Sequence, residues 1–155
     1  MEEYCGPLVG APWDASRWPN FAVSEIACSC CGEVYIWPEP LDALRRLCNL
    51  IGGPLTITSG HRCARHNSDP KTGGKNHSVH LQLAFDLALK TYPRSRMLAL
   101  ARAAGFKRFG LMLTGLHVDT HPLDAQHAEM WTYGPKSRTA WNGLFPVGTI
   151  DIGGA

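Results

Sequence analysis

The chain has 155 residues, which fits a single domain with its own core and leaves no room for a second catalytic domain. Its hydrophobic fraction of 45% and charged fraction of 18% are typical of a globular protein and exclude a disordered or fibrous one. The formal net charge is +2 and the 15 Lys and Arg residues are scattered, so the sequence argues against nucleic-acid binding.

The first ten residues, MEEYCGPLVG, are acidic and contain Gly and Pro, so they lack the basic and apolar regions of a secretory signal. No apolar run approaches the ~18 to 20 residues that a membrane helix needs. We therefore expect a protein made in the cytoplasm without a signal peptide and without membrane insertion. Action outside the cytoplasm would need a lytic system, a virion, or a signal absent from this sequence.

The first half of the chain predicts four segments. Residues 1–20 contain prolines and tryptophans without periodicity, which predicts an irregular arm. Residues 41–51 place leucines and isoleucine at helical spacing before Gly-Gly-Pro, which predicts a core helix. Residues 55–58 are β-branched at three of four positions and predict a short strand, whereas the polar residues 64–79 predict a loop.

The next predicted strand, residues 83–89, contains an acidic residue at its centre. Alternation puts Asp86 and alanines on one face and larger apolar side chains on the other. A second helix is predicted over RSRMLALARAA, which lies between a proline and a glycine. The segments FGLML and LHVDT flank Thr114 and Gly115 and predict a hairpin.

This order of elements predicts an α+β fold: one compact domain with a small, largely antiparallel central sheet flanked by helices. We expect the domain to span residues 21–135. Residues 136–155 are expected to form a tail that packs on the domain or binds a partner.

Six cysteines are many for a cytosolic protein, and Cys28, Cys30 and Cys31 crowd into one turn. Three interpretations remain open: buried thiols in a tight turn, a disulfide to Cys63, or a structural zinc site that uses Cys28, Cys31 and Cys63. A four-ligand zinc site normally presents two well-separated ligand pairs. Because no second pair is evident, structural zinc is the least favoured of the three.

Three candidate ligands for a catalytic metal stand in polar segments: His80, Asp86 and His117. Zinc favours imidazole and carboxylate ligands, and a catalytic site supplies three of them while leaving one position open. Taken alone, each histidine would usually be solvated and the acid would usually be a cap or ion-pair partner. The set favours a metal site because Asp86 lies in an apolar strand, where an unpaired carboxylate is costly.

In LHVDTH, alternation puts His117, Asp119 and His121 on one face of the strand, so a ligand and a second acid can point into the same cleft. The alternative is the polar outer face of an antiparallel strand, which is common.

Successive blocks of the sequence resemble the zinc D-Ala-D-Ala carboxypeptidase and endopeptidase family of peptidoglycan hydrolases, peptidase family M15. The blocks are VSEIACSCCGE, PLDALRRL, PLTITSGHRC, GGKNHSVHLQLAFDLAL, GFKRFG and LHVDT with the following Trp131. They occur in the family's order between about residues 21 and 131. The resemblance implies a compact α+β domain of the hedgehog/DD-peptidase type.

The resemblance also implies roles for individual residues. His80 of the Ser-x-His motif, Asp86 and His117 would hold Zn²⁺. Arg62 of the Ser-Gly-x-Arg motif would help to hold a substrate carboxylate or carbonyl oxygen, which suits a planar guanidinium, although a structural ion pair is the alternative. Ser78 and Trp131 are expected to join Arg62 in contacting substrate, a peptidoglycan stem peptide.

The chain departs from the family pattern at the general base. Many members place Glu or Asp three residues before the last ligand, where this chain has Thr114. Asp119 is therefore the expected base, and it could equally be an acceptor that orients His117. Glu129 is a further candidate.

A second departure concerns spacing, because His80 and Asp86 are six residues apart where the family has seven, as if a Gly between Gln82 and Leu83 were missing. We expect the segment from Leu81 to Gln82 to tighten so that His80, rather than His77, remains the ligand.

Two functions follow from these expectations. The first is zinc-dependent hydrolysis of peptide bonds in bacterial peptidoglycan, with a phage or prophage lytic enzyme, or a virion-associated one, as the expected setting. The second is a non-catalytic structural or cell-wall-binding relative that keeps the fold.

Overall fold

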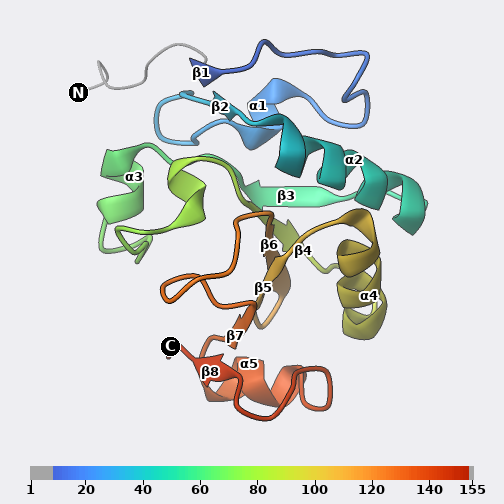
Figure 1. Ribbon diagram of the computed structural model, residues 1–155, viewed down its shortest axis with the longest axis vertical. Helices are drawn as coiled ribbons and strands as arrows, with labels where there is room; N and C mark the ends of the chain where they lie inside the picture. The colour runs from blue at the N-terminus through green and yellow to red at the C-terminus, as the bar shows by residue number, and fades with distance from the viewer. Residues whose placement is uncertain (1–8, 154–155) are drawn as a thin grey trace.

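The computed structural model describes residues 9–153 and confirms the α+β class (Figure 1). Most predicted elements form, with shifted ends, and the predicted helix RSRMLALARAA is observed over its whole length. In chain order the elements are β1 (Val9–Gly10), α1 (Val23–Ile26), β2 (Tyr35–Ile36), α2 (Pro38–Ile51), β3 (Thr56–Ser59), α3 (Ala64–Ser68), a 3₁₀ turn (Val79–Leu81), β4 (Phe85–Ala88), α4 (Arg94–Ala104), β5 (Arg108–Leu111), β6 (Gly115–Asp119), β7 (Met130–Thr132), α5 (Pro135–Ala140) and β8 (Ile150–Asp151).

The central sheet has the strand order β3-β4-β6-β5-β7-β8 within the described residues. Its first four strands pair antiparallel, which confirms the predicted hairpin of β5 and β6 and the largely antiparallel sheet. Strands β7 and β8 extend the sheet in parallel. Strands β1 and β2 form a separate parallel pair.

The core lies against one face of the sheet, where α2 and α4 pack (Figure 1). Three leucines of α2 are 0% exposed, and so are Met97 of α4 and Phe85 and Leu87 of β4, whereas Leu50 near the end of α2 is exposed. Because side chains alternate along a strand, Asp86 between Phe85 and Leu87 points to the opposite face. The predicted alternation in β4 is therefore observed, and it puts the carboxylate outside the hydrophobic core.

One predicted loop contains a short helix. Residues 64–79 were expected to lack regular structure, yet α3 forms at Ala64–Ser68. Its first turn is capped by Cys63, whose sulfur accepts a hydrogen bond from the backbone N–H of His66. The polar sequence of this segment did not predict α3, because the helix is stabilised by its cap and by burial of Asn67 and has no apolar periodicity.

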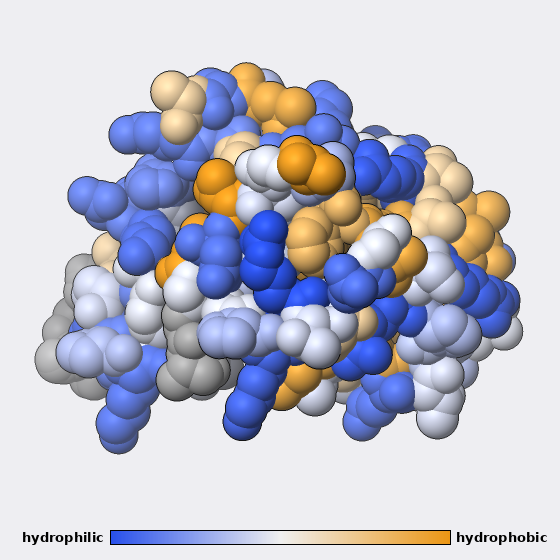
Figure 2. All heavy atoms as spheres, turned by 90° about the horizontal axis from the view of Figure 1, so that it is seen from below, coloured by the Kyte–Doolittle hydropathy of each residue, from blue (hydrophilic) through white to orange (hydrophobic). Residues whose placement is uncertain are grey.

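Both end segments pack on the domain where the structure describes them. In the predicted arm, Trp18 is buried and its indole N–H donates to Asp42 at 2.9 Å, while residues 1–8 lie outside the described part. In the predicted tail, Trp141 is buried, its indole donates to the Met112 carbonyl at 2.7 Å, and β8 joins the sheet. On the face seen in Figure 2, hydrophobic residues are interspersed with hydrophilic ones.

None of the helices between residues 9 and 153 is long and apolar enough to cross a membrane.

Candidate metal centre

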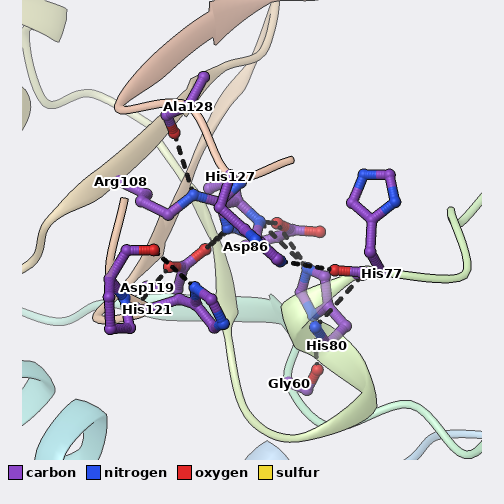
Figure 3. A network of polar contacts seen from close by, with 12 residues as sticks. Gly60, His77, His80, Asp86, Arg108, Asp119, His121, His127 and Ala128 are labelled. Atoms are coloured by element: carbon purple, nitrogen blue, oxygen red, sulfur yellow. Dashed lines mark hydrogen bonds and ion pairs between the residues drawn. The ribbon is translucent and has the colours of Figure 1, made fainter. Parts of the chain in front are cut away.

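Neighbouring strands and one turn bring the three predicted ligands together, and Figure 3 shows two of them, His80 and Asp86, side by side. Asp86 on β4 and His117 on β6 are direct cross-strand partners, so their side chains share one face of the sheet. His80 comes from the 3₁₀ turn, where Ser78 caps the first residues by accepting from the His80 N–H at 3.2 Å. One ligand atom from each residue lies within 4.8 Å of the other two.

The distances within this trio fit one metal ion. His80 Nε2 lies 3.2 Å from Asp86 Oδ1, His117 Nδ1 lies 3.1 Å from the same oxygen, and the two nitrogens are 3.2 Å apart. With zinc bonds of about 2.0 to 2.1 Å, ligand atoms of a tetrahedral site are about 3.3 to 3.4 Å apart. The side chains therefore need only small shifts to hold zinc.

Hydrogen bonds orient both histidines toward the shared point. His80 Nδ1 donates to the Gly60 carbonyl at 2.7 Å, which leaves Nε2 to face Asp86 (Figure 3). Gly60 is required there, because a Cβ would lie 2.4 Å from the Ile26 carbonyl oxygen. His117 Nε2 donates to Asp119 at 2.6 Å, which leaves Nδ1 for the metal. Such outer contacts are usual for histidines that bind zinc.

Asp119 lies on the far side of the His117 ring from the other two ligands, and it is 0% exposed. Its Oδ2 also accepts from Arg108 at 2.8 Å, and its Oδ1 accepts from the His121 backbone N–H at 3.0 Å. Arg108 and Asp119 are cross-strand partners on β5 and β6. This placement favours the role of orienting His117 over direct contact with water or substrate. The sequence offered no signal for Arg108 beyond the GFKRFG block.

The electrostatics of the trio reflect burial and close charges. Burial lowers the pKa of His80 below its ordinary value. Burial acts in the same direction on His117, but its hydrogen bonds to Asp119 and Asp86 outweigh this and raise its pKa to about 9. The neighbouring histidines hold the pKa of Asp86 well below its usual range despite its burial. A metal ion at this point would therefore displace a proton from His117.

A cleft of about 480 Å³ opens above the trio. It is lined by the ligands and by the three residues predicted to contact substrate: Arg62, Ser78 and Trp131. Arg62 also forms the alternative ion pair, since its Nη2 lies 3.3 Å from Asp86 Oδ2 and its Nε donates to Ser59.

Two aromatic residues form part of the cleft wall. The ring of Trp131 lies 5.2 Å from that of His117, and it can pack there because Gly110 has no Cβ to meet it. Tyr133, which the sequence did not indicate, also lines the cleft. Burial and the nearby charge of Asp86 raise the pKa of its hydroxyl well above the usual range, so the group keeps its proton.

The chain between His80 and Asp86 begins with a tight turn. The Gln82 N–H donates to the Val79 carbonyl at 2.9 Å, which closes the 3₁₀ turn, and Gln82 itself has unusual backbone angles of φ −108° and ψ −91°. His77 is not part of the trio. Its carbonyl accepts from His127 Nε2 at 3.0 Å, which fastens the loop before the turn.

Glu129, the further candidate for the general base, lies outside the cleft. It is exposed and pairs with Arg102 at 2.9 Å. Among the acidic residues of the described part, Asp86 alone lines the cleft.

A second group of possible ligands, which the sequence did not indicate as a set, consists of His121, Asp124 and His127. The two imidazole rings stack with centroids 3.8 Å apart. His127 already uses one nitrogen on Asp124 at 2.7 Å and the other on the His77 carbonyl. This group therefore acts as a clamp on the loop rather than as an open metal site.

An α+β domain with a largely buried His, Asp, His trio at the floor of a cleft has the features of a metal-dependent hydrolase. A family model described as Peptidase M15 matches residues 19–121, more than half of the chain. The chain belongs to this peptidase family, which confirms the resemblance found in the sequence and implies peptidase activity. A search of curated proteins finds no match.

Proposed function

We propose that this protein is a zinc-dependent peptidase that hydrolyses peptide bonds in the stem peptides of bacterial peptidoglycan. The observation that carries the proposal is the trio of His80, Asp86 and His117, whose mutual distances match a tetrahedral zinc site and whose histidines are already oriented by hydrogen bonds. Zinc held there would supply Lewis acidity, which polarises a carbonyl group and activates water.

Arg62 and Tyr133 are the donors that we expect to act on substrate. Arg62 uses Nη2 on Asp86 and Nε on Ser59, so further N–H groups of its guanidinium remain for a substrate carboxylate or carbonyl oxygen. Tyr133 keeps its hydroxyl proton because its pKa is raised, and it lines the same cleft. Both can stabilise negative charge that develops on a carbonyl oxygen.

The charge of the cleft supports an anionic peptide as substrate. Arg62 and Lys75 line it, and Asp86, its acidic member in the described part, is used by the histidines and Arg62. Stem peptides carry carboxylates and short side chains, which suits a cleft whose rim includes the Gly-rich loop at residues 72–75. We propose the bacterial cell wall as the site of action, with a phage or virion lysis system as the setting.

One observation favours the non-catalytic alternative. The cleft offers no acid, among the described residues, that could accept a proton beside the metal, because Asp119 is turned away and Glu129 lies on the surface. A relative that binds cell-wall peptides without cleaving them would show this arrangement.

The test is digestion of purified peptidoglycan by zinc-loaded protein, with released peptides identified by mass spectrometry. We expect cleavage of peptide bonds that stops on removal of zinc and in His117→Ala, and that persists in Glu129→Gln, a surface control. Full zinc occupancy with peptide binding but no cleavage between pH 5 and 10 would establish the non-catalytic alternative.

A further inference from the structure

Four cysteine sulfurs from two distant segments meet on the side of the domain near α1 and α3. Cys28, Cys30 and Cys31 lie in the turn that follows α1, and Cys63 immediately precedes α3. All four sulfurs lie within 4.8 Å of one another. No step of the proposed reaction uses these residues.

A second ligand pair, which the sequence interpretation missed, lies at the start of α3, where Cys63 is the N-cap. Cys63 and His66 are separated by two residues, the spacing of one half of a structural zinc site. His66 Nδ1 lies 3.3 Å from the sulfur of Cys28. The histidine thus completes a second ligand pair, which the cysteines alone do not provide.

Three distances between these groups are close to those of a tetrahedral metal site. The sulfur of Cys30 lies 3.5 Å from that of Cys28 and 3.4 Å from that of Cys63. With zinc–sulfur bonds of about 2.3 Å and zinc–nitrogen bonds of about 2.0 Å, ligand atoms are about 3.5 to 3.8 Å apart, so a slight expansion would admit the ion.

Backbone N–H groups point at the sulfurs. The Cys63 N–H lies 3.4 Å from the sulfur of Cys28, and the His66 N–H lies 3.4 Å from that of Cys63. Sulfur accepts hydrogen bonds weakly as a thiol, whereas charged acceptors make stronger ones, so this arrangement suits thiolates. Cys28 and Cys63 are also buried, at 2% and 4% exposure.

We propose that Cys28, Cys30, Cys63 and His66 form a structural zinc site, separate from the His80 trio. Cys31 is disulfide-bonded in the structure and is therefore not assigned as a ligand. All four assigned positions are filled by protein groups, so this site leaves no position open for water and does no chemistry of its own.

The proposed zinc ion would have a structural consequence, because it would fix the position of a segment that contributes to the metal centre. A zinc ion here would join the turn after α1 to the segment that leads into α3, between residues 35 apart in the chain. That segment already donates one backbone hydrogen bond toward α1, from the His61 N–H to the Ile26 carbonyl at 2.8 Å. It also carries Gly60, which orients His80, and Arg62, which reaches the cleft. The proposed ion is thus a positioning element for the metal centre.

The test is a measurement of zinc per chain. The protein is purified under reducing conditions and without added zinc. We expect His117→Ala, which lacks the trio, to retain about one zinc ion per chain. In that background, Cys63→Ser and Cys28→Ser should lose it, whereas Cys48→Ser, a cysteine of α2 outside the cluster, should keep it.

A spectroscopic measurement on the unmutated chain covers the case in which a variant fails to fold. The cobalt-substituted protein should show intense sulfur-to-cobalt charge-transfer bands, which the His, Asp, His trio cannot produce. Absence of these bands together with a zinc-free His117→Ala variant would overturn the proposal. A disulfide between Cys30 and Cys63 in the freshly purified protein would overturn it in favour of a covalent crosslink.

A matched pair of variants tests the assignment of Cys30, rather than Cys31, as a zinc ligand. Cys30→Ser should lose the structural zinc, and Cys31→Ser should keep it. The reverse result would overturn the assignment of Cys30.

Discussion

Replacement of Asp119 by Asn separates the two roles that this residue could have. The carboxylate accepts three hydrogen bonds: from His117 and Arg108 on Oδ2, and from the His121 backbone on Oδ1. An amide of the same size has one acceptor oxygen and one NH₂ group, so at least one of these donors must face another donor. The substitution also removes the negative charge that neutralises Arg108.

The size of the expected loss in folding free energy follows from the burial of Asp119. Asp119 is fully buried and the Arg108 side chain is about 9% exposed, so the pair behaves as an interior ion pair. Breaking such a pair by removing one partner costs roughly 3 to 5 kcal/mol of folding free energy. Loss of the group that orients a metal-binding histidine typically weakens metal affinity about 10- to 100-fold. We therefore expect a lower Tm and weaker zinc binding in Asp119→Asn.

The assay is zinc affinity by competition with a chelator, followed by turnover of a peptidoglycan peptide at saturating zinc. An orienting Asp119 predicts weaker zinc binding, with much of the turnover recovered once zinc is saturating. Glu129→Gln is the matched control, because it removes the same charge from an exposed ion pair and should change neither quantity.

Unchanged zinc affinity combined with a turnover loss of about 10² to 10⁴-fold would refute this reasoning, since that is the effect of removing a general base. The geometry of Asp119 would then have to change on substrate binding.

Three further predictions test the centre. His80→Ala should abolish zinc binding at the trio while His77→Ala spares it, as measured by metal content of variants that also lack the cysteine site; loss of zinc in His77→Ala alone would contradict the ligand assignment. Because the pKa of His117 is raised from 6.5 to about 9, its protonation should stabilise the metal-free fold fully below pH 6.5, and this contribution should vanish as pH rises through 9. Thermal denaturation of the chelated protein should therefore show a Tm that declines over this pH range. The His117→Gln variant should lack this decline. Gly60→Ala should lower Tm, because its Cβ would press against the Ile26 carbonyl. It should also weaken zinc binding, because it moves the carbonyl that accepts from His80. A wild-type zinc affinity in a folded variant would argue against the role of Gly60 in orienting His80.

Local patterns in the sequence predicted much of the fold and the identity of the trio. The alternation around Asp86 identified a carboxylate opposite the core, and the hairpin prediction placed His117 on a strand that could reach it. The period of a strand or helix depends on neighbours in the chain, so these features could be read without tertiary information. The family blocks then connected His80 to the same site.

Only the tertiary structure decided which partners surround those residues. The register of β5 against β6 pairs Arg108 with Asp119, and that pairing turns Asp119 toward His117 and away from the cleft. Packing of α3 beside the turn after α1 brings His66 to Cys28, although they are 38 positions apart in the sequence. Strand register and loop docking depend on the whole core, because they are chosen by burial and close packing rather than by nearby residues. The sequence alone therefore indicated the trio and the cysteine cluster as possible ligands, whereas the fold added His66 and determined what each neighbouring residue does.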